Sequence, residues 1–312
     1  APDLTRRSVI AVAGAPFIGR ALSQTRQRPN FLFIIADDHA GYVLGADGNR
    51  QARTPNLDQL ASESVRFTHH FCNSPVCTPS RQGLITGQLP HAAGVTRLPP
   101  KLDTEKPTLA KQFKRAGYTT AVFGKMHFNR PGAPGLHGFD LCNTEDVLNK
   151  RWQAEVQPRA LPDGARVKPP WRPFRDPARV WLNADKLPYR RYDEDMRASY
   201  QVRLVEQYLA GQRAGEPFAL WVSFLEPHSP YDFPFEFRDR FDAGRFTPPR
   251  VGPEDAWQIP NIFRDLTDDE KRGIAAAYYT SVEFLDRNIG RVLAKLSALG
   301  MAEDTVVVYT AD

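Results

Sequence analysis

Residues 31–38 read FLFIIADD, a run of six apolar residues followed directly by Asp37 and Asp38. A continuous apolar run, unlike one that alternates with polar residues, predicts a strand that is covered on both faces of its sheet. Burial on both faces is typical of parallel sheets packed between helices. The stretch therefore predicts a buried parallel strand with two carboxylates at its carboxyl end.

Three other apolar segments run into polar residues in the same way. They are residues 119–123 before Lys125 and His127, residues 219–224 before His228, and residues 305–309 before Asp312. Helical patterns over residues 109–116, 196–209 and 267–299 alternate with them, and the last opens with a capping box, TDDE, at residues 267–270. We therefore expect an α/β fold, with a mostly parallel central sheet flanked by helices on both faces.

The four polar strand ends predict a single site. Open α/β sheets bind ligands beyond the carboxyl ends of their strands, so these side chains are expected to converge. Residues 132–192 and 226–260 are rich in proline and aromatic residues and show little periodicity. We predict that both are long loops over the rim of the site, where substrate selection usually resides.

Composition limits the possible partners. The chain has 312 residues, 41% of them hydrophobic, which is enough for a full globular core. Its net charge of +5 comes from 41 basic and 36 acidic residues scattered without long runs, so nucleic acid is not an expected partner. No apolar stretch is long enough to cross a bilayer, and no membrane span is predicted.

The amino-terminal 27 residues differ from the rest. Arg6 and Arg7 precede an apolar run over residues 9–18, a pattern typical of an export signal and suggestive of the twin-arginine route. We expect residues 1–27 to be an export signal and linker, which predicts a location in the bacterial periplasm, although a frayed helix is the alternative. Residues 28–312 form the predicted folded domain.

Three cysteines are an odd number and contain no C-x-x-C pair. A disulfide framework is therefore not expected, and at least one thiol must be free or modified. Cys72 is expected to pack as a small apolar residue. Cys77 is different, because it lies in the stretch SPVCTPSRQGLITG at residues 74–87, with Arg81 close behind it.

The polar residues at the strand ends suit metal-assisted ester hydrolysis. Asp37, Asp38 and Asp312 offer hard oxygen ligands for calcium or magnesium, whereas zinc would prefer histidine or thiolate. Cationic and proton-carrying groups that could neutralise a tetrahedral oxyanion accompany them: Arg81, Lys125, His127 and His228. Each has an ordinary structural explanation if taken alone. Their shared position favours a site that hydrolyses a sulfate or phosphate ester.

The stretch CTPSR at residues 77–81, followed by LITG at residues 84–87, resembles the signature of the type I sulfatases of the alkaline phosphatase superfamily. Further blocks are similar to that family in order: RPN at 28–30, TPNLD at 54–58, GKMH at 124–127, EPH at 226–228 and TAD at 310–312. The resemblance covers residues 28–312 and implies a sulfatase catalytic domain. In the family, a dedicated formylglycine-generating or sulfatase-maturing enzyme oxidises the cysteine to formylglycine.

The resemblance also implies a role for each site residue. Asp37, Asp38 and Asp312 would bind calcium, together with an oxygen of the modified Cys77. The aldehyde would hydrate to a geminal diol, and the metal would lower the pKa of one hydroxyl, which then attacks sulfur in line. Arg81 would hold the modified residue near the metal.

Three further residues would act on the sulfate. Lys125 would bridge the modified residue to a sulfate oxygen and neutralise charge that develops in the transition state. His228 would bind sulfate and protonate the leaving alkoxide. His127 would take a proton from the second hydroxyl, so that sulfate is released and the aldehyde regenerated.

In the family, another metal ligand, a sulfate-binding lysine and a smaller carboxyl-terminal region follow the position of Asp312. We therefore expect this chain to be truncated at its carboxyl-terminal end.

The substrate stays open at this point. A sulfuric ester hydrolase acting on a small sulfated molecule or a sulfated glycan is the leading hypothesis. A phosphonate or phosphate monoester hydrolase of the same superfamily is one alternative. The other is a catalytically silent protein that binds sulfated ligands.

Overall fold

The computed structural model describes residues 28–163 and 191–312 and contains a five-stranded parallel sheet with the order β3-β2-β4-β1-β5. The strands are β1 (Asn30–Ala36), β2 (Thr119–Gly124), β3 (Leu141–Thr144), β4 (Phe218–Ser223) and β5 (Thr305–Ala311). The four strands expected from apolar runs are confirmed as parallel neighbours. The predicted export segment at residues 1–27 lies outside the described residues.

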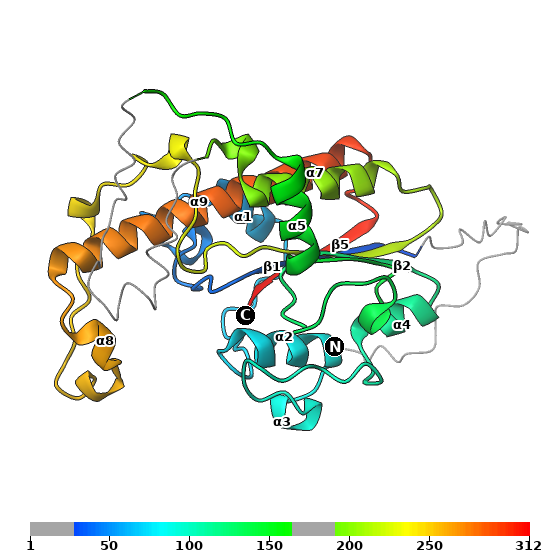
Figure 1. Cartoon of the computed structure of the whole chain (residues 1–312), viewed down its shortest axis with the longest axis horizontal. Coiled ribbons are helices and arrows are strands. Elements are labelled where there is room, and N and C mark those ends of the chain that lie inside the picture. Colours follow the sequence, from blue (N-terminus) through cyan, green and yellow to red (C-terminus); the bar gives the residue numbers. More distant parts are fainter. Residues whose placement is uncertain (1–27, 164–190) are drawn as a thin grey trace, which may run out of the picture.

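Helices cover both faces of the sheet, as predicted (Figure 1). The α-helices are α1 (Pro55–Ser62), α2 (Cys77–Thr86), α3 (Pro90–Ala93), α4 (Leu109–Arg115), α5 (Glu145–Glu155), α7 (Arg197–Ala210), α8 (Asn261–Arg264) and α9 (Asp268–Ala298). Single 3₁₀ turns are η1 (Gly45–Asp47), η2 (Leu136–Gly138), η4 (Asp193–Asp195), η5 (Phe235–Phe237), η6 (Ala243–Arg245) and η7 (Ala256–Gln258). In Figure 1, α2, α3 and α4 lie on one side of the sheet, and α1, α5, α7 and α9 on the other.

Each face of the sheet has its own hydrophobic core. Leu32 and Ile34 of β1 are fully buried against α7 and α9, while their neighbour Ile35 faces the core beneath α2 and α4. Trp221 of β4 fills the centre of this second core and stacks on Phe33 at 4.5 Å between ring centroids. Each fully buried side chain of this size contributes about 1.5–3 kcal/mol through removal from water.

Helix α9 precedes β5 in the chain and bonds to the backbone just beyond the end of β1. It begins with the predicted capping box, in which the Thr267 side chain accepts from the Glu270 N–H and the Glu270 carboxylate accepts from the Thr267 N–H. From the middle of this helix, the Tyr278 hydroxyl donates to the Asp38 carbonyl over 2.6 Å. Helix α9 thereby holds, through Tyr278, the backbone that carries the strand-end carboxylates.

Strand register brings the polar ends together. Ala36 is paired with Ala311, so that Asp37 and Asp312 follow directly at the ends of adjacent strands. Gly124 is paired with Ser223, which aligns the ends of β2 and β4. The predicted convergence of the strand ends is therefore confirmed.

Residues 132–192 were expected to be one long loop, and this is wrong for their first part. That part contains η2, β3 and α5. Only Leu148 of α5 is buried, so the helix has almost no apolar periodicity that sequence could reveal. Residues 226–260 do form a long connection, which contains only the short turns η5 to η7. The expectation for Cys72 is also wrong, because this residue is exposed.

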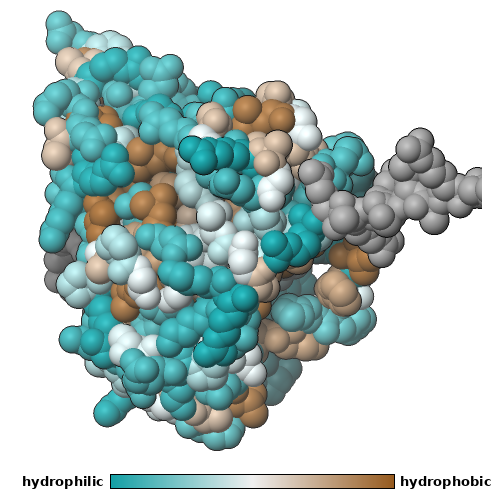
Figure 2. Space-filling model, turned by 90° about the vertical axis from the view of Figure 1, so that its right-hand side faces the viewer, coloured by the Kyte–Doolittle hydropathy of each residue, from teal (hydrophilic) through white to brown (hydrophobic). Residues whose placement is uncertain are grey.

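The face of the molecule in Figure 2 is largely hydrophilic, with apolar residues in scattered patches. Among the described residues, no helix combines the length and the apolar character needed to span a membrane.

Gly124 is a backbone requirement of the fold at the end of β2. Its φ of +102° is one that residues with a side chain rarely adopt, and a Cβ at this position would lie 1.8 Å from the Ser223 carbonyl oxygen. Only glycine allows β2 to approach β4 this closely before the chain turns toward Lys125.

Gly124→Ala is expected to destabilise the protein by about 2–4 kcal/mol, because the added methyl collides with backbone as well as imposing an unfavourable φ. Gly300→Ala is the matched control, since Gly300 has a φ of +68° and open space around its Cβ position. It should cost only about 1–2 kcal/mol. Urea unfolding of both variants measures the difference, and equal losses would show that the collision is not the constraint.

Candidate active site

Cys77 is the first residue of α2 and follows the extended residue Val76. Pro79 falls in the first helical turn, where its missing N–H costs no intrahelical hydrogen bond. Arg81 comes one turn after Cys77, so both side chains lie on the same side of the helix. The sequence CTPSR therefore folds into a helix start that directs the cysteine and the arginine to one place.

Arg81 is fully buried and contacts the ends of four adjacent strands. Its Nε donates to Asp312 Oδ2 over 2.7 Å, and its Nη2 lies 3.2 Å from Asp37 Oδ1. Its Nη1 donates to the Lys125 carbonyl over 2.6 Å and to Ser223 Oγ over 2.7 Å. One guanidinium group therefore holds the carboxyl ends of β1, β2, β4 and β5 together.

Three carboxylates gather beside this guanidinium. One oxygen each from Asp37, Asp38 and Asp312 lies within 4.8 Å of the others. Asp312 Oδ1 accepts from the Asp38 N–H over 3.1 Å, and the Lys125 ammonium donates to Asp37 Oδ2. Asp37 is fully buried, whereas Asp38 is exposed, so the cluster extends from the sheet end toward solvent.

The charges act differently on each carboxyl pKa. Burial alone would raise the pKa of Asp37, but Arg81 and Lys125 outweigh it and hold the pKa at about 2. Burial raises the pKa of Asp312 to about 6, with Arg81 opposing and Asp37 reinforcing the shift. Desolvation and the charge of Asp37 raise the pKa of Asp38 as well. Desolvation first, and the charge of Asp37 second, therefore disfavour the ionised forms of Asp38 and Asp312, and a bound cation would favour them.

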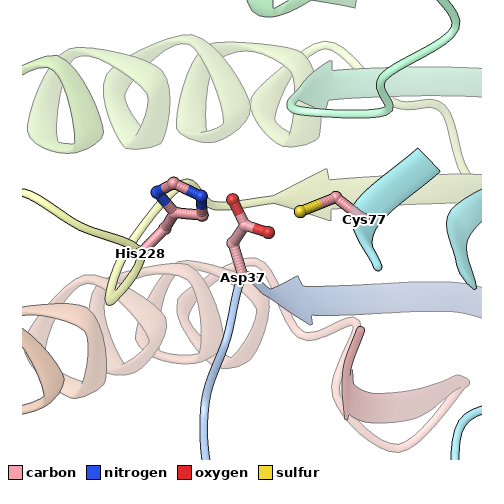
Figure 3. Close-up of side chains that lie close together, drawn as sticks. All are labelled: Asp37, Cys77 and His228. Atoms are coloured by element: carbon pink, nitrogen blue, oxygen red, sulfur yellow. The ribbon is translucent and has the colours of Figure 1, made fainter. Parts of the chain in front are cut away.

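Cys77 and His228 lie on either side of Asp37, as Figure 3 shows. Cys77 Sγ, an Asp37 oxygen and a His228 ring nitrogen are within 4.8 Å of one another. His228 Nδ1 donates to the Ser229 carbonyl over 2.6 Å, which leaves Nε2 facing Asp38 Oδ2 at 3.7 Å. Burial and the charge of Asp37 raise the pKa of the Cys77 thiol to about 11, so the thiol stays protonated at neutral pH.

His127 lies on the segment that follows Gly124, and its backbone has a left-handed φ of 55°. Burial, followed by the charge of Lys125, lowers the pKa of His127, so its ring is neutral at neutral pH. Its Nδ1 is buried and has no hydrogen-bond partner among the described residues. A neutral imidazole with a free nitrogen can accept a proton.

A hard divalent cation fits the carboxylate group. Carboxylate oxygens are the ligands that calcium and magnesium prefer. Asp37 Oδ1, although buried, makes no hydrogen bond within residues 28–163 and 191–312. The residues that would hold the ion are Asp37, Asp38 and Asp312, with the side chain at position 77 adjacent to Asp37.

The strand-end side chains expected to meet do lie together at one edge of the sheet. Three polar residues that support the site were not expected from the sequence, namely Ser223, Gln82 and Glu145. Gln82 and Glu145 bond to the backbone at residues 126 and 127. Contacts between a side chain and a distant backbone group leave no periodic signal in a sequence, although Glu145 stands at a helix start where acidic residues are favoured.

Comparisons with known proteins agree on one family. A family model described as Sulfatase matches residues 29–312. The choline-sulfatase of Rhizobium meliloti is 28% identical over 305 residues, which covers 92% of this chain and 58% of that protein. The ulvan-active sulfatase of Formosa agariphila is 29% identical over 299 residues, which covers 91% of this chain and 50% of that protein.

Among solved structures, the phosphonate monoester hydrolase of Agrobacterium radiobacter superposes with a TM-score of 0.70 at 25% sequence identity. The match covers 91% of this chain and 62% of that one. The chain therefore spans between half and two thirds of the length of these three relatives.

Calcium is expected to raise the melting temperature of the metal-free protein at pH 7, because the ion relieves repulsion among the carboxylates. The Asp312 carboxyl, with a pKa of about 6, must lose its proton to bind the ion. The calcium-induced shift should therefore be largest at pH 7 to 8 and decline as the pH falls through about 6 toward 5. Differential scanning fluorimetry between pH 5 and 8 measures it.

Asp38→Asn is expected to reduce the calcium shift, whereas Asp239→Asn, which neutralises an exposed carboxylate outside the cluster, should leave it unchanged. An equal shift in wild type and Asp38→Asn at every pH would contradict binding by this cluster.

Proposed function

Because the chain belongs to the sulfatase family, we propose that the protein is a sulfuric ester hydrolase that cleaves sulfate monoesters with a formylglycine made from Cys77. One observation carries the proposal: Cys77 starts a helix at the carboxyl end of the parallel sheet, beside Asp37 and His228. The protonated state of the thiol supports conversion, since a thiol with a pKa near 11 is a poor nucleophile at neutral pH.

Two groups would complete the site. Hydrated formylglycine at position 77 would supply one hydroxyl as the nucleophile toward sulfur and a second hydroxyl for the release of sulfate. A calcium ion, or alternatively magnesium, would be held by Asp37, Asp38 and Asp312 with the modified side chain at position 77, and it supplies positive charge beside the nucleophile.

The two permanent cations of the site have different roles: Arg81 positions the residue at 77, and Lys125 neutralises charge on the sulfate. Arg81 is fixed by contacts to four strand ends, so it holds the helix start at position 77 against the sheet. The Lys125 ammonium is paired with Asp37, and 10% of the Lys125 side chain is exposed. We assign it to a sulfate oxygen, where its charge opposes the negative charge that grows in the transition state.

The two histidines carry protons. His228 donates through Nδ1 to the Ser229 carbonyl, which fixes its ring and aims Nε2 into the site. We assign Nε2 to sulfate binding and to protonation of the leaving alkoxide. His127 is neutral at neutral pH and has a free Nδ1, which suits it to remove the proton that accompanies sulfate release.

The proposed substrate is a small sulfated molecule or a sulfated glycan. This proposal is supported by similarity to two proteins. The choline-sulfatase of Rhizobium meliloti is named for a small molecule, and the ulvan-active sulfatase of Formosa agariphila is named for a glycan. A formylglycine-generating or sulfatase-maturing enzyme is the required partner. We also propose that residues 1–27 direct export to the periplasm, because Arg6 and Arg7 precede an apolar run there.

A phosphonate monoester hydrolase is the second candidate, favoured by the structural similarity to the Agrobacterium radiobacter enzyme. Sulfate monoesters and phosphonate monoesters each carry one negative charge, whereas phosphate monoesters carry nearly two, so the charge of the site can disfavour a phosphate monoester but cannot separate sulfate from phosphonate monoesters. Comparing kcat/KM on p-nitrophenyl sulfate and p-nitrophenyl phenylphosphonate distinguishes them. A higher value on the phosphonate would overturn the sulfatase assignment.

The chemical state of Cys77 is the most direct test. After denaturation and alkylation, the tryptic peptide from residue 67 to residue 81 contains both Cys72 and Cys77. We expect Cys72 to be alkylated and Cys77 to appear as the lighter aldehyde, which reacts with a hydrazide. Cys72 thus serves as an internal control for the alkylation.

Protein from a host that carries the maturing enzyme is needed for this measurement. Two alkylated cysteines together with no turnover of p-nitrophenyl sulfate would refute the proposed mechanism and favour a silent binding protein. Cys77→Ala should lower kcat by about 1000-fold or more, because no other group in the site replaces the nucleophile.

A further inference from the structure

The segment Lys125–Met126–His127 is bonded to its surroundings through every peptide group it contains. Its N–H groups at residues 126 and 127 point to Glu145 of α5, which accepts both over 3.0 Å, one with each carboxylate oxygen. A carboxylate that accepts two neighbouring N–H groups fixes the plane of the peptide between them. Glu145 therefore holds one edge of the segment.

Helix α2 holds the opposite edge. The Gln82 amide donates to the carbonyls of Met126 and His127 over 3.1 and 3.0 Å, and Arg81 donates to the carbonyl of Lys125. Three consecutive carbonyls are thus bonded to two adjacent side chains of the helix that begins at Cys77. Gln82 is fully buried, so water does not compete for these contacts.

These two sets of hydrogen bonds hold a backbone segment whose conformation is unfavourable by itself. His127 has a φ of 55°, a conformation that costs a residue with a side chain about 1–3 kcal/mol. Gly124, with a φ of +102°, lies just before the segment. Without acceptors on one edge and donors on the other, the segment would relax and move His127.

We propose that Gln82 and Glu145 are positioning residues. They fix the positions of Lys125 and His127 relative to the side chain at position 77, as hydrolysis of the sulfate ester requires. The proposal rests on the proposed function. Gln82 ties the segment to the helix that carries the nucleophile, and Glu145 ties it to a helix on the other face of the sheet. The reacting groups therefore keep their separation although they come from different elements.

Two near-isosteric variants test the proposal in the purified protein. Glu145→Gln keeps one acceptor oxygen and loses the other, and Gln82→Met removes both donors at the same side-chain length. Asp140→Asn is the matched control. Asp140 accepts from the Thr120 N–H over 3.1 Å in the same way, but at the amino end of β2, away from the site.

We expect kcat on p-nitrophenyl sulfate to fall about 10- to 100-fold in Glu145→Gln and Gln82→Met, with KM within about threefold of wild type. Amide hydrogen exchange, followed by mass spectrometry, should accelerate at residues 126–127 in Glu145→Gln. In Asp140→Asn it should accelerate only near Thr120, with kcat unchanged within about twofold.

Wild-type kcat in both site variants would overturn the proposal. So would a loss of kcat that is matched by Asp140→Asn and follows the melting temperature, because that pattern marks general destabilisation. A wild-type protein without turnover and with Cys77 as thiol would refute the proposed function instead. In that case, the amide hydrogen exchange rate at residues 126–127 in Glu145→Gln still tests whether Glu145 holds the segment.

Discussion

The buried guanidinium group of Arg81 is the interaction on which this site depends. Removing a cation from water is expensive, and a buried ion pair is favourable only when its remaining hydrogen bonds are also made. Here two carboxylates, a backbone carbonyl and a hydroxyl from four strands surround the group. Because Arg81 lies one turn from Cys77, the contacts that hold the strand ends in register also place the cysteine over them.

The same centre can attract both a cation and an anionic ester. Asp37, Asp38 and Asp312 face two permanent cations, Arg81 and Lys125, so carboxylates are in excess. Asp38, the exposed member, is the carboxylate that neither cation contacts directly, and the carboxyl pKa values of Asp38 and Asp312 are both raised. The inner carboxylate, Asp37, is held ionised by its cationic neighbours. Cationic and anionic groups thus lie in direct contact at one site, and the surplus carboxylate charge suits a bound metal ion.

Much of this arrangement could be predicted from sequence because it follows from local pattern. Continuous apolar runs indicate parallel strands, and the residues after them converge at the carboxyl edge, as Asp37 and Asp312 do. The order of the strands, the helix α5 and the supporting roles of Gln82 and Glu145 could not be predicted. A helix with one buried apolar residue has no detectable period, and bonds from side chains to a distant backbone depend on the finished fold.

The burial of the helix start has a consequence for the order of events during synthesis. Thr78, Ser80 and Arg81 are almost inaccessible in the folded protein, and Cys77 is already part of a helix. An enzyme that reads these residues by their side chains can bind them only while the segment is still extended. If Cys77 is converted as proposed, folding and conversion would compete in rate, and a chain that folds first would keep its thiol.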